Sequence, residues 1–233
     1  MVIVMSRQIK TVEDLEDAIT KEYSWRGKEI EQIRIRVKNS DNGNGKGRPL
    51  TLEEKSLILI LYANWEGFIN VAANLYVQYV FAQGIPLIKL KTGFWEIQIH
   101  PSFENFKNIR SQDAKKKFLD ELRESFSLTQ FREYKNDHKK RYISTNSNLD
   151  SGTFMGILDI LSLDESKFDL SKNFIDSILL NYRNGLAHGE RGYDVDFSDM
   201  LDTIDYITKL MREFQECIID AAQKKTYLSG TNE

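Results

Sequence analysis

One long segment of the sequence, residues 51–83, constrains the fold more than any other part of the chain. It begins with Thr51 and Glu54, whose spacing is that of a capping box, which satisfies free backbone amides at a helix start. It ends before Gly84 and Pro86, which stop a helix. Its apolar residues cover a wide helical face: Leu57, Leu61, Trp65, Phe68, Ile69, Ala72, Leu75, Tyr76 and Tyr79. We therefore expect residues 51–83 to form a central helix that is largely buried.

Apolar residues recur at helical spacing elsewhere in the chain, which indicates a protein built of helices. We expect an N-terminal helix at residues 11–38, a later helix at 171–188 and a C-terminal helix at 197–223. Residues 39–50 are rich in Gly, Asn and Asp and are expected to form a flexible loop. This loop lacks the GxxxxGK[ST] spacing of a phosphate-binding loop. The predicted fold class is all-α, with residues 1–233 forming one domain, a bundle of about five or six helices.

The segment that follows the central helix, residues 87–145, is expected to be an irregular, basic insertion. Apolar and polar residues alternate from Phe94 to Ile99, which is typical of a short strand, although an extended stretch is equally compatible. A charged helix is expected from Ser111 to about Phe126. Between residues 107 and 141, eleven Lys or Arg against six Asp or Glu give a net charge of +5. Such a patch suits a polyanion. The candidate RNA-binding residues in it are Lys115, Lys116, Lys139, Lys140 and Arg141. The alternative is a solvated helix face whose aromatic residues belong to the core.

The composition narrows the class of protein further. The formal net charge of −3 does not by itself mark a nucleic-acid binder. Cys217 is the single cysteine, so no disulfide can form within the chain, and a reducing, cytoplasmic location is expected. Met1 to Met5 are too short for a secretory signal, and the most apolar run, Leu57 to Tyr62, is too short to span a membrane. His100 and His138 have no partner pattern that indicates a metal site, and we expect them at the surface or in packing roles.

The most concentrated chemistry lies in residues 182–190, where an arginine, an amide and a histidine follow one another closely. Arg183 can hold a phosphate with two hydrogen bonds, and His188 can move a proton near neutral pH. On a regular helix five residues turn the direction by about 140°, so the two side chains would flank one edge of the helix. They converge if the last turn loosens or if a second copy of the helix packs alongside. The alternative is a helix end whose cations offset the negative pole of the helix dipole.

Three stretches together resemble the HEPN superfamily of all-α proteins. The pattern Arg183-Asn184-x-x-x-His188 is similar to its R-x(4–6)-H signature, with the polar residue that often follows the arginine. The chain also resembles one bacterial subfamily, which is typed by two cyanobacterial hypothetical proteins. Three stretches carry this resemblance: Trp65 to Phe68 (Trp-Glu-Gly-Phe), Ile143 to Leu149 (Ile-Ser-Thr-x-Ser-Asn-Leu) and Arg183 to Glu190 (Arg-Asn-x-x-Ala-His-Gly-Glu). The resemblance extends from Leu15 to Cys217. Some relatives have a histidine at the position of Asn64, so this chain would lack only the auxiliary role that a histidine has there.

The resemblance implies a metal-independent endoribonuclease that acts as a homodimer, often as a toxin or a defence component. Two R-x(4–6)-H helices would line one composite cleft, where an RNA 2′-hydroxyl attacks the adjacent phosphorus and leaves a 2′,3′-cyclic phosphate. His188 would be the general acid or base, Arg183 would hold the phosphate, and Asn184 would orient a phosphate oxygen or His188. Glu66 and Glu190 are auxiliary candidates, Glu66 by fixing Arg183 or tuning His188. The implied partners are RNA, a second copy, and a cognate antitoxin or nucleotidyltransferase, without a metal, a cofactor or a membrane.

Two other functions stay open. A non-catalytic HEPN module would bind RNA, a nucleotide or a partner protein. The C-terminal part favours protein contacts, because residues 184–233 hold five Lys or Arg and ten Asp or Glu, a net charge of −5. A purely structural helical adaptor with a fortuitous motif is the third hypothesis. We expect Arg183 and His188 to line an open cleft at a two-fold interface if the protein is catalytic, and an intrachain ion pair if it is an adaptor.

Overall fold

The computed structural model describes residues 9–40, 51–106, 108–127, 142–145, 148–169, 171–176 and 197–230. Their α-helices are α1 (Val12–Ser40), α2 (Leu52–Ala82), α3 (Thr92–Phe106), α4 (Gln112–Ser125), α5 (Ser151–Leu161), α6 (Ser171–Phe174) and α8 (Phe197–Lys224). Two short 3-10 helices are η1 (Leu87–Lys89) and η2 (Glu165–Phe168). These stretches contain no strand, and the predicted all-α fold class is confirmed.

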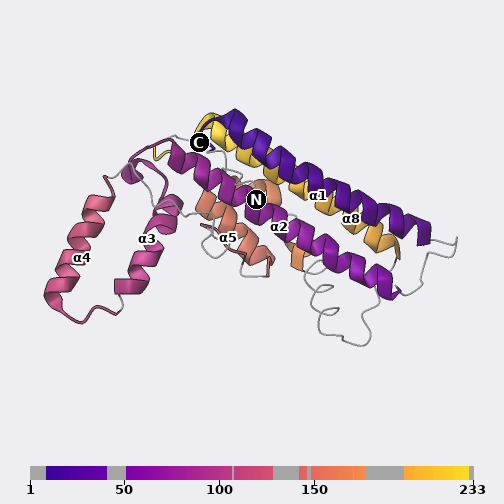
Figure 1. Ribbon diagram of the computed structural model, residues 1–233, viewed down its shortest axis with the longest axis horizontal. Coiled ribbons are helices and arrows are strands. Elements are labelled where there is room, and N and C mark those ends of the chain that lie inside the picture. Colours follow the sequence, from indigo (N-terminus) through magenta and orange to yellow (C-terminus); the bar gives the residue numbers. More distant parts are fainter. Residues whose placement is uncertain are drawn as a thin grey trace, which may run out of the picture.

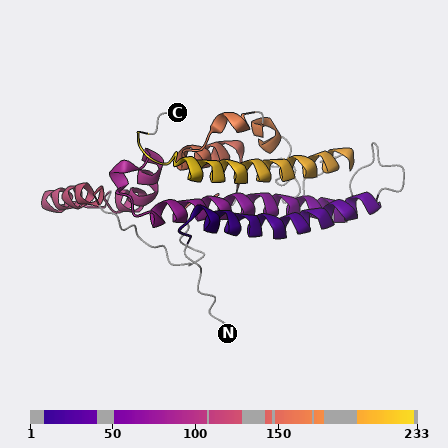
Figure 2. The ribbon, with the colours of Figure 1, turned by 90° about the horizontal axis from the view of Figure 1, so that it is seen from above.

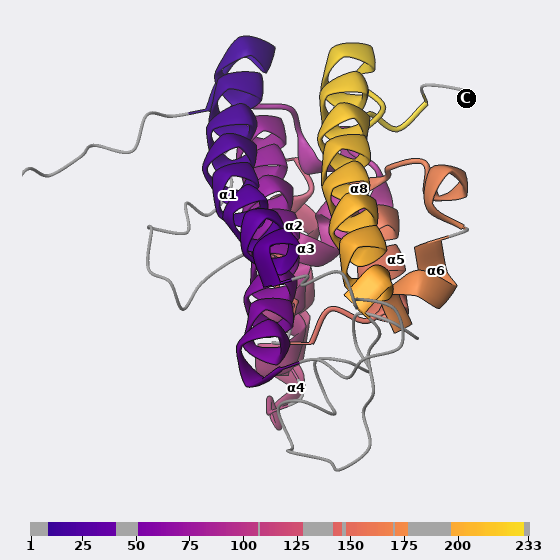
Figure 3. The ribbon, with the colours of Figure 1, turned by 90° about the vertical axis from the view of Figure 1, so that its right-hand side faces the viewer.

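Three long helices, α1, α2 and α8, run side by side along the length of the protein (Figures 1 and 2). The shorter α5 packs against α2 and α3, and Figure 3 shows it beside α8 with α6 next to it. Aromatic rings fill the space between the helices. Phe154 of α5 lies 5.8 Å from Phe214 of α8 and 5.3 Å from Trp65 of α2, measured between ring centroids. All three side chains are fully buried, so this aromatic cluster is the centre of the core.

The central helix α2 begins and ends within one residue of its predicted range, and both capping-box hydrogen bonds form. The amide of Glu54 donates to the Thr51 hydroxyl (3.3 Å), and the amide of Thr51 donates to the Glu54 carboxylate (2.7 Å). The same carboxylate accepts a hydrogen bond from the hydroxyl of Ser40, at 2.5 Å, so it joins the end of α1 to the start of α2. Gly84 has a φ of +63°, a conformation that follows many helix ends. By length and composition α2 could cross a membrane, but 61% of its most apolar window is buried inside the protein, as in a core helix.

Residues 94–99 are helical in α3, so the expectation of a strand or an extended stretch was wrong. The alternating pattern arose because α3 is covered on more than one side. Phe94 is fully buried and packs against Tyr76 of α2 (6.1 Å), whereas Trp95 packs against Phe126 beyond the end of α4 (5.0 Å). Gly93 allows the start of α3 to approach α5 closely, because a Cβ there would lie 2.0 Å from the carbonyl oxygen of Ile160.

Helices α3 and α4 project from one end of the bundle as an arm (Figures 1 and 2). The segment 87–145 was expected to be irregular apart from one charged helix, yet two helices occupy most of its described part. The expected charged helix is α4, which Ser111 caps by accepting a hydrogen bond from Ala114. Phe106 and Phe118 hold the two helices together at 4.9 Å, but no residue of α4 is buried. The arm therefore offers much of its surface to solvent.

The end of α8 is joined to the start of the arm. After α8 the backbone carbonyl of Tyr227 accepts a hydrogen bond from the amide of Lys91, at 2.8 Å, and the amide of Ser229 donates to the carbonyl of Lys89, at 2.9 Å. Leu90 and Leu228 form an isolated antiparallel bridge in between. This junction fixes η1 and the beginning of α3 against the C-terminal end of the bundle.

Candidate functional site

The predicted catalytic residues Arg183, Asn184 and His188, with Glu190, lie outside the described residues. Of the helix expected at residues 171–188, the structure describes α6 and one wider, π-helical turn at Ile175 and Asp176. The C-terminal helix expected at 197–223 is α8. The structure therefore shows how the chain enters and leaves the segment that carries the motif.

The entry to the motif segment is anchored on the start of α5. Asp176, seven residues before Arg183, accepts hydrogen bonds from the amide of Ser151 (2.8 Å) and from its hydroxyl (2.5 Å). A carboxylate at a helix N-terminus is also stabilised by the helix dipole. On the other side, the ring of Phe174 packs on Tyr206 of α8 at 4.1 Å. The chain is thus held between α5 and α8 just before the motif begins.

Helix α8 begins with exposed carboxylates near the other end of the motif segment. Asp199, Asp202 and Asp205 follow one another at helical spacing on its exposed face. Asp205 forms an ion pair with Arg34 of α1 at 2.5 Å. These carboxylates disfavour an RNA phosphate next to the start of α8, unless a cation lies between them.

Two of the three stretches behind the HEPN resemblance lie against each other. A short strap, residues 142–149 as far as they are described, runs along α2. The side chain of Asn74 accepts hydrogen bonds from the amides of Tyr142 (2.8 Å) and Ile143 (3.2 Å), and it donates to the carbonyl of Ile143 at 3.0 Å. Farther along, the hydroxyl of Tyr62 accepts from the amide of Leu149 at 2.7 Å. The strap leads directly into α5.

Glu66 contacts this strap. Its carboxylate accepts a hydrogen bond from the hydroxyl of Thr145, at 2.6 Å. The side chain of Glu66 is half-buried, so it is not the fully solvent-exposed residue of the alternative interpretation. Its auxiliary role toward Arg183 or His188 stays a prediction, because both of those residues lie outside the described part of the chain. In the structure Glu66 holds the strap in place through its hydrogen bond with Thr145.

The neighbours of Glu66 have structural roles in joining α1 to α2. Gly67 leaves room for Arg26, because a Cβ at Gly67 would lie 2.5 Å from a guanidinium nitrogen of Arg26. Arg26 donates to the backbone carbonyl of Asn64 at 3.3 Å and forms an ion pair with Glu22 at 2.7 Å. The side chain of Asn64 is buried and donates to the carbonyl of Ile60 at 3.0 Å. Asn64 therefore packs within the helix pair.

The two candidate RNA-binding residues that the structure describes, Lys115 and Lys116, lie away from the described ends of the motif segment. Lys115 and Lys116 lie on α4 in the arm, whereas α8 begins at the opposite end of the protein (Figure 1). Lys139, Lys140 and Arg141 lie outside the described residues, so RNA binding by the basic patch stays a prediction. Within one protomer, Lys115 and Lys116 are far from both described ends of the motif segment.

The described residues contain no group of three or more His, Cys, Asp and Glu side chains able to hold a metal ion. Cys217 is buried in α8, as its helical pattern indicated, and burial raises the pKa of its thiol. His138 lies outside the described residues, and His100 belongs to α3.

Sequence reasoning missed Asp176, Thr145 and Arg26. Each makes its contact across a large separation in sequence, for example 79 residues between Thr145 and Glu66. The one available signal was that Trp65 to Phe68 and Ile143 to Leu149 both belong to the resemblance, which is a reason to expect them to be close.

A family model described as HEPN_MAE_28990-like HEPN matches residues 15–227. Neither a curated protein nor a solved structure matches the chain significantly.

Proposed function

The chain belongs to the HEPN_MAE_28990-like HEPN family, and from this premise we propose that it is a metal-independent endoribonuclease. One observation carries the proposal: the family match spans the complete Arg183-Asn184-x-x-x-His188 pattern. HEPN modules are often ribonucleases, and the pattern supplies a cation for phosphate and a group that transfers protons at neutral pH.

The proposed chemistry needs no metal ion. The 2′-hydroxyl of one nucleotide attacks the neighbouring phosphorus, and the 5′-oxygen of the next nucleotide leaves, so the products are a 2′,3′-cyclic phosphate and a 5′-hydroxyl. His188 takes the proton from the 2′-hydroxyl or gives one to the leaving oxygen. Arg183 stabilises the charge that develops on the phosphate, and Asn184 orients a phosphate oxygen or His188. Glu190 is an auxiliary residue in this scheme.

Two copies of the motif segment would form one site. This supplies both an acid and a base, because each copy contributes one His188. The anchoring of Asp176 to α5 and of Phe174 to α8 supports the proposal, since a catalytic segment must be positioned to within about 0.5 Å by its surroundings. We assign Asp176 as a positioning residue, and Glu66 with Thr145 as a support for the strap beside it.

A direct assay tests the catalytic proposal. Purified wild type, Arg183→Ala and His188→Ala would be incubated with structured and single-stranded RNA in the presence of EDTA. We expect cleavage by the wild type, with products that carry 2′,3′-cyclic phosphate, and a loss of at least about 100-fold in each variant. The matched control is His138→Ala, which removes a histidine outside the motif and should keep full activity. Equal cleavage by the wild type and His188→Ala, or no cleavage of any RNA by the wild type, would contradict the proposal.

The second candidate is a non-catalytic HEPN module that binds RNA, a nucleotide or a partner protein. The observation in its favour is the pair of exposed carboxylates Asp199 and Asp202 at the start of α8, which suits a basic protein surface. Wild type that binds RNA or a partner without cleaving any RNA, with or without EDTA, would favour this candidate.

We place the activity in a toxin or anti-phage setting in the cytoplasm, with an antitoxin or a nucleotidyltransferase as a candidate partner. In that setting, expression of the wild type should slow growth, and expression of His188→Ala to the same level should not. Unchanged growth under both conditions would argue against a toxin that acts without a trigger.

A further inference from the structure

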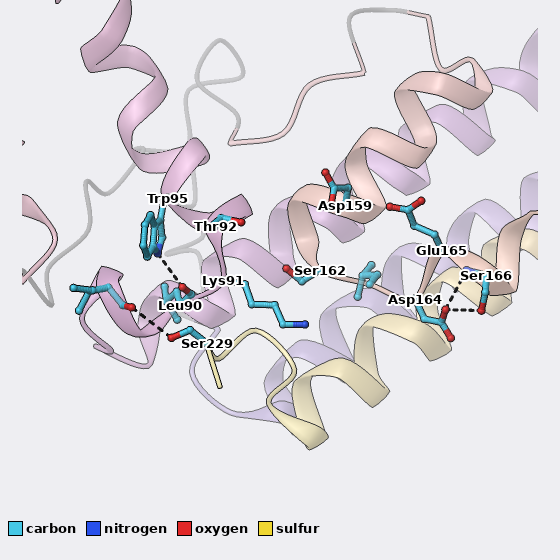
Figure 4. A pocket seen from close by; sticks show the side chains of 12 residues that line it. Leu90, Lys91, Thr92, Trp95, Asp159, Ser162, Asp164, Glu165, Ser166 and Ser229 are labelled. Atoms are coloured by element: carbon cyan, nitrogen blue, oxygen red, sulfur yellow. Dashed lines mark hydrogen bonds between the residues drawn. The ribbon is translucent and has the colours of Figure 1, made fainter. Parts of the chain in front are cut away.

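A groove lies at the base of the arm, between the start of α3, the end of α5, η2 and the residues that follow α8 (Figure 4). Its volume is about 690 Å³. The carboxylates of Asp159, Asp164 and Glu165 lie on one side of the groove and Trp95 lies on the other (Figure 4). Ile88, whose carbonyl accepts a hydrogen bond from the hydroxyl of Ser229, also lines the groove. We call this feature the acidic groove.

The carboxylates of the acidic groove form no ion pair within the described part of the chain, although the nearby charge of Lys167 acts on Asp164. Asp159, Asp164 and Glu165 are exposed, and none of them forms an ion pair with another described residue. Asp164 accepts hydrogen bonds from the amide and hydroxyl of Ser166, which leave its negative charge in place. Among the described residues that line the groove, Lys91 is the single lysine, so this part of the lining has three negative charges against one positive charge.

The opposite side of the groove is apolar and rigid. The indole nitrogen of Trp95 donates to the backbone carbonyl of Leu90 at 2.9 Å, and its ring packs on Phe126, so its orientation is fixed. Ile88 is 56% exposed although it is a large apolar residue. An acidic edge that faces an exposed apolar edge suits a ligand with cationic and apolar side chains in one row.

Such a row is present on the arm of the same protein. Lys116, Leu119 and Arg123 recur at helical spacing on one exposed side of α4, and Leu119 is 52% exposed. We call these three residues the basic stripe. Within the described residues Arg123 has one weak ion pair, with Asp120 at 3.7 Å, and both side chains are mostly exposed. The arm projects away from the bundle (Figure 2), so the stripe does not lie in the groove of its own chain.

We propose that a second copy of this chain docks the basic stripe of its α4 into the acidic groove. Lys116 and Arg123 of one copy would meet Asp159, Asp164 and Glu165 of the other, and Leu119 would contact the apolar edge at Ile88. Asp120, beside the stripe, would meet Lys91, the one cation of the groove. Each copy has both a stripe and a groove, so a two-fold axis between the copies would let the contact form twice.

The charge of α4 favours a second copy over RNA as the occupant. Lys115, Lys116, Lys117 and Arg123 are balanced by Asp113, Asp120, Glu121 and Glu124, so the helix as a whole has no net charge. An extended polyanion gains little from such a helix, whereas a groove with local charges of both signs can pair with it group by group. This contact does not depend on ribonuclease activity, and it involves neither the motif segment nor its two anchors.

Charge reversal on each side tests the contact. Lys116→Glu with Arg123→Glu reverses the stripe, and Asp159→Lys with Glu165→Lys reverses the groove. Asp159 and Glu165 are chosen because their side chains make no hydrogen bond among the described residues, unlike Asp164. We expect sedimentation velocity to show a dissociation constant at least about tenfold higher for each double variant than for the wild type. Circular dichroism would verify that both variants keep the helical fold.

Mixing the two double variants gives the sharper result. In the mixture, the reversed stripe of one chain meets the reversed groove of the other, and the two natural surfaces meet as well. Both contacts are therefore attractive again, and the mixture should associate as the wild type does. No restoration on mixing, or association of either variant alone with wild-type affinity, would overturn the proposal.

Cysteine crosslinking identifies the contact even if another surface also joins two copies. A chain with Leu119→Cys mixed with a chain with Ser166→Cys should form an intermolecular disulfide under mild oxidation. The control is Lys117→Cys, on the opposite side of α4, which should crosslink to Ser166→Cys at least about tenfold less. The natural Cys217 is buried and does not compete. Absence of the Leu119→Cys crosslink would overturn the proposal. A stripe variant that loses RNA binding while its association is unchanged would assign this surface to RNA instead.

Discussion

Replacement of Asp176 by alanine would test whether the segment that carries the motif is held by α5. The substitution removes two hydrogen bonds, one to the amide and one to the hydroxyl of Ser151, at 2.8 and 2.5 Å. Hydrogen bonds to a charged group contribute about 1.5–3 kcal/mol each, and a half-buried pair lies at the low end because water replaces part of the loss. We therefore expect Asp176→Ala to lower the free energy of unfolding by about 3 kcal/mol. Ser151→Ala removes the hydroxyl bond alone and should cost about 1.5 kcal/mol.

Urea unfolding of the single variants and of the double variant measures these values. The control is Asp169→Ala, because Asp169 is nearby, pairs with Lys172 at the surface and is 60% exposed, so its loss should cost less than about 0.5 kcal/mol. The double-mutant cycle between Asp176 and Ser151 should give a coupling energy of about 1 kcal/mol. If Asp176→Ala costs no more than Asp169→Ala, the carboxylate does not anchor the segment. In the proposed ribonuclease, Asp176→Ala should also lower cleavage while His188 is intact.

Three further predictions concern packing, pH and cysteine reactivity. Gly93→Ala should destabilise the protein by about 1–3 kcal/mol in thermal unfolding, because the new Cβ would lie 2.0 Å from a backbone carbonyl of α5. The control Gly156→Ala, whose Cβ would have no atom within 4 Å, should stabilise the protein by up to about 1 kcal/mol. Equal effects of the two substitutions would contradict the close approach of α3 and α5. The pKa of Asp150 is lowered mainly by hydrogen bonds from Thr153. The contribution of Asp150 to stability is therefore complete above about pH 4 and is lost as the pH falls further. Asp150→Asn should remove this part of the acid dependence of stability, and an unchanged pH profile would disprove the prediction. Iodoacetamide at pH 8 should modify Cys217 only when the protein unfolds, because the thiol is buried and its pKa is raised; fast labelling of the native protein, followed by mass spectrometry, would contradict this.

Elements whose signals are local could be predicted from the sequence. The start of α2 depends on Thr51 and Glu54, which are three residues apart, and its end depends on the glycine that follows. Helix α8 has a strong apolar stripe and lies where its pattern placed it. Helix α3 was missed because two different neighbours cover Phe94 and Trp95, and such double coverage gives the same alternation as a strand.

Contacts between distant segments could not be predicted from the same signals. The resemblance gave a reason to expect the segments of Glu66 and Thr145 to be close, but no local pattern pairs these two side chains, and none pairs Asp176 with the start of α5. Each hydrogen bond depends on how whole helices pack, and a single sequence does not specify that packing. The motif itself was found through its chemistry and its resemblance to a family, and its residues lie outside the described part of the chain.

The pairing of the first long helix with the last one also affects how the protein is made. Gln215 of α8 donates a hydrogen bond to the hydroxyl of Thr20 in α1, which lies 195 residues earlier in the sequence. The ring of the neighbouring Phe214 packs against the ring of Phe68 in α2. A ribosome adds about 5–20 residues per second, so the roughly 160 residues between α1 and α8 require on the order of ten seconds or more. During that time the surfaces of α1 and α2 that α8 will cover stay exposed to water. The nascent chain should therefore depend on chaperones until α8 leaves the ribosome, and chains truncated before α8 should aggregate.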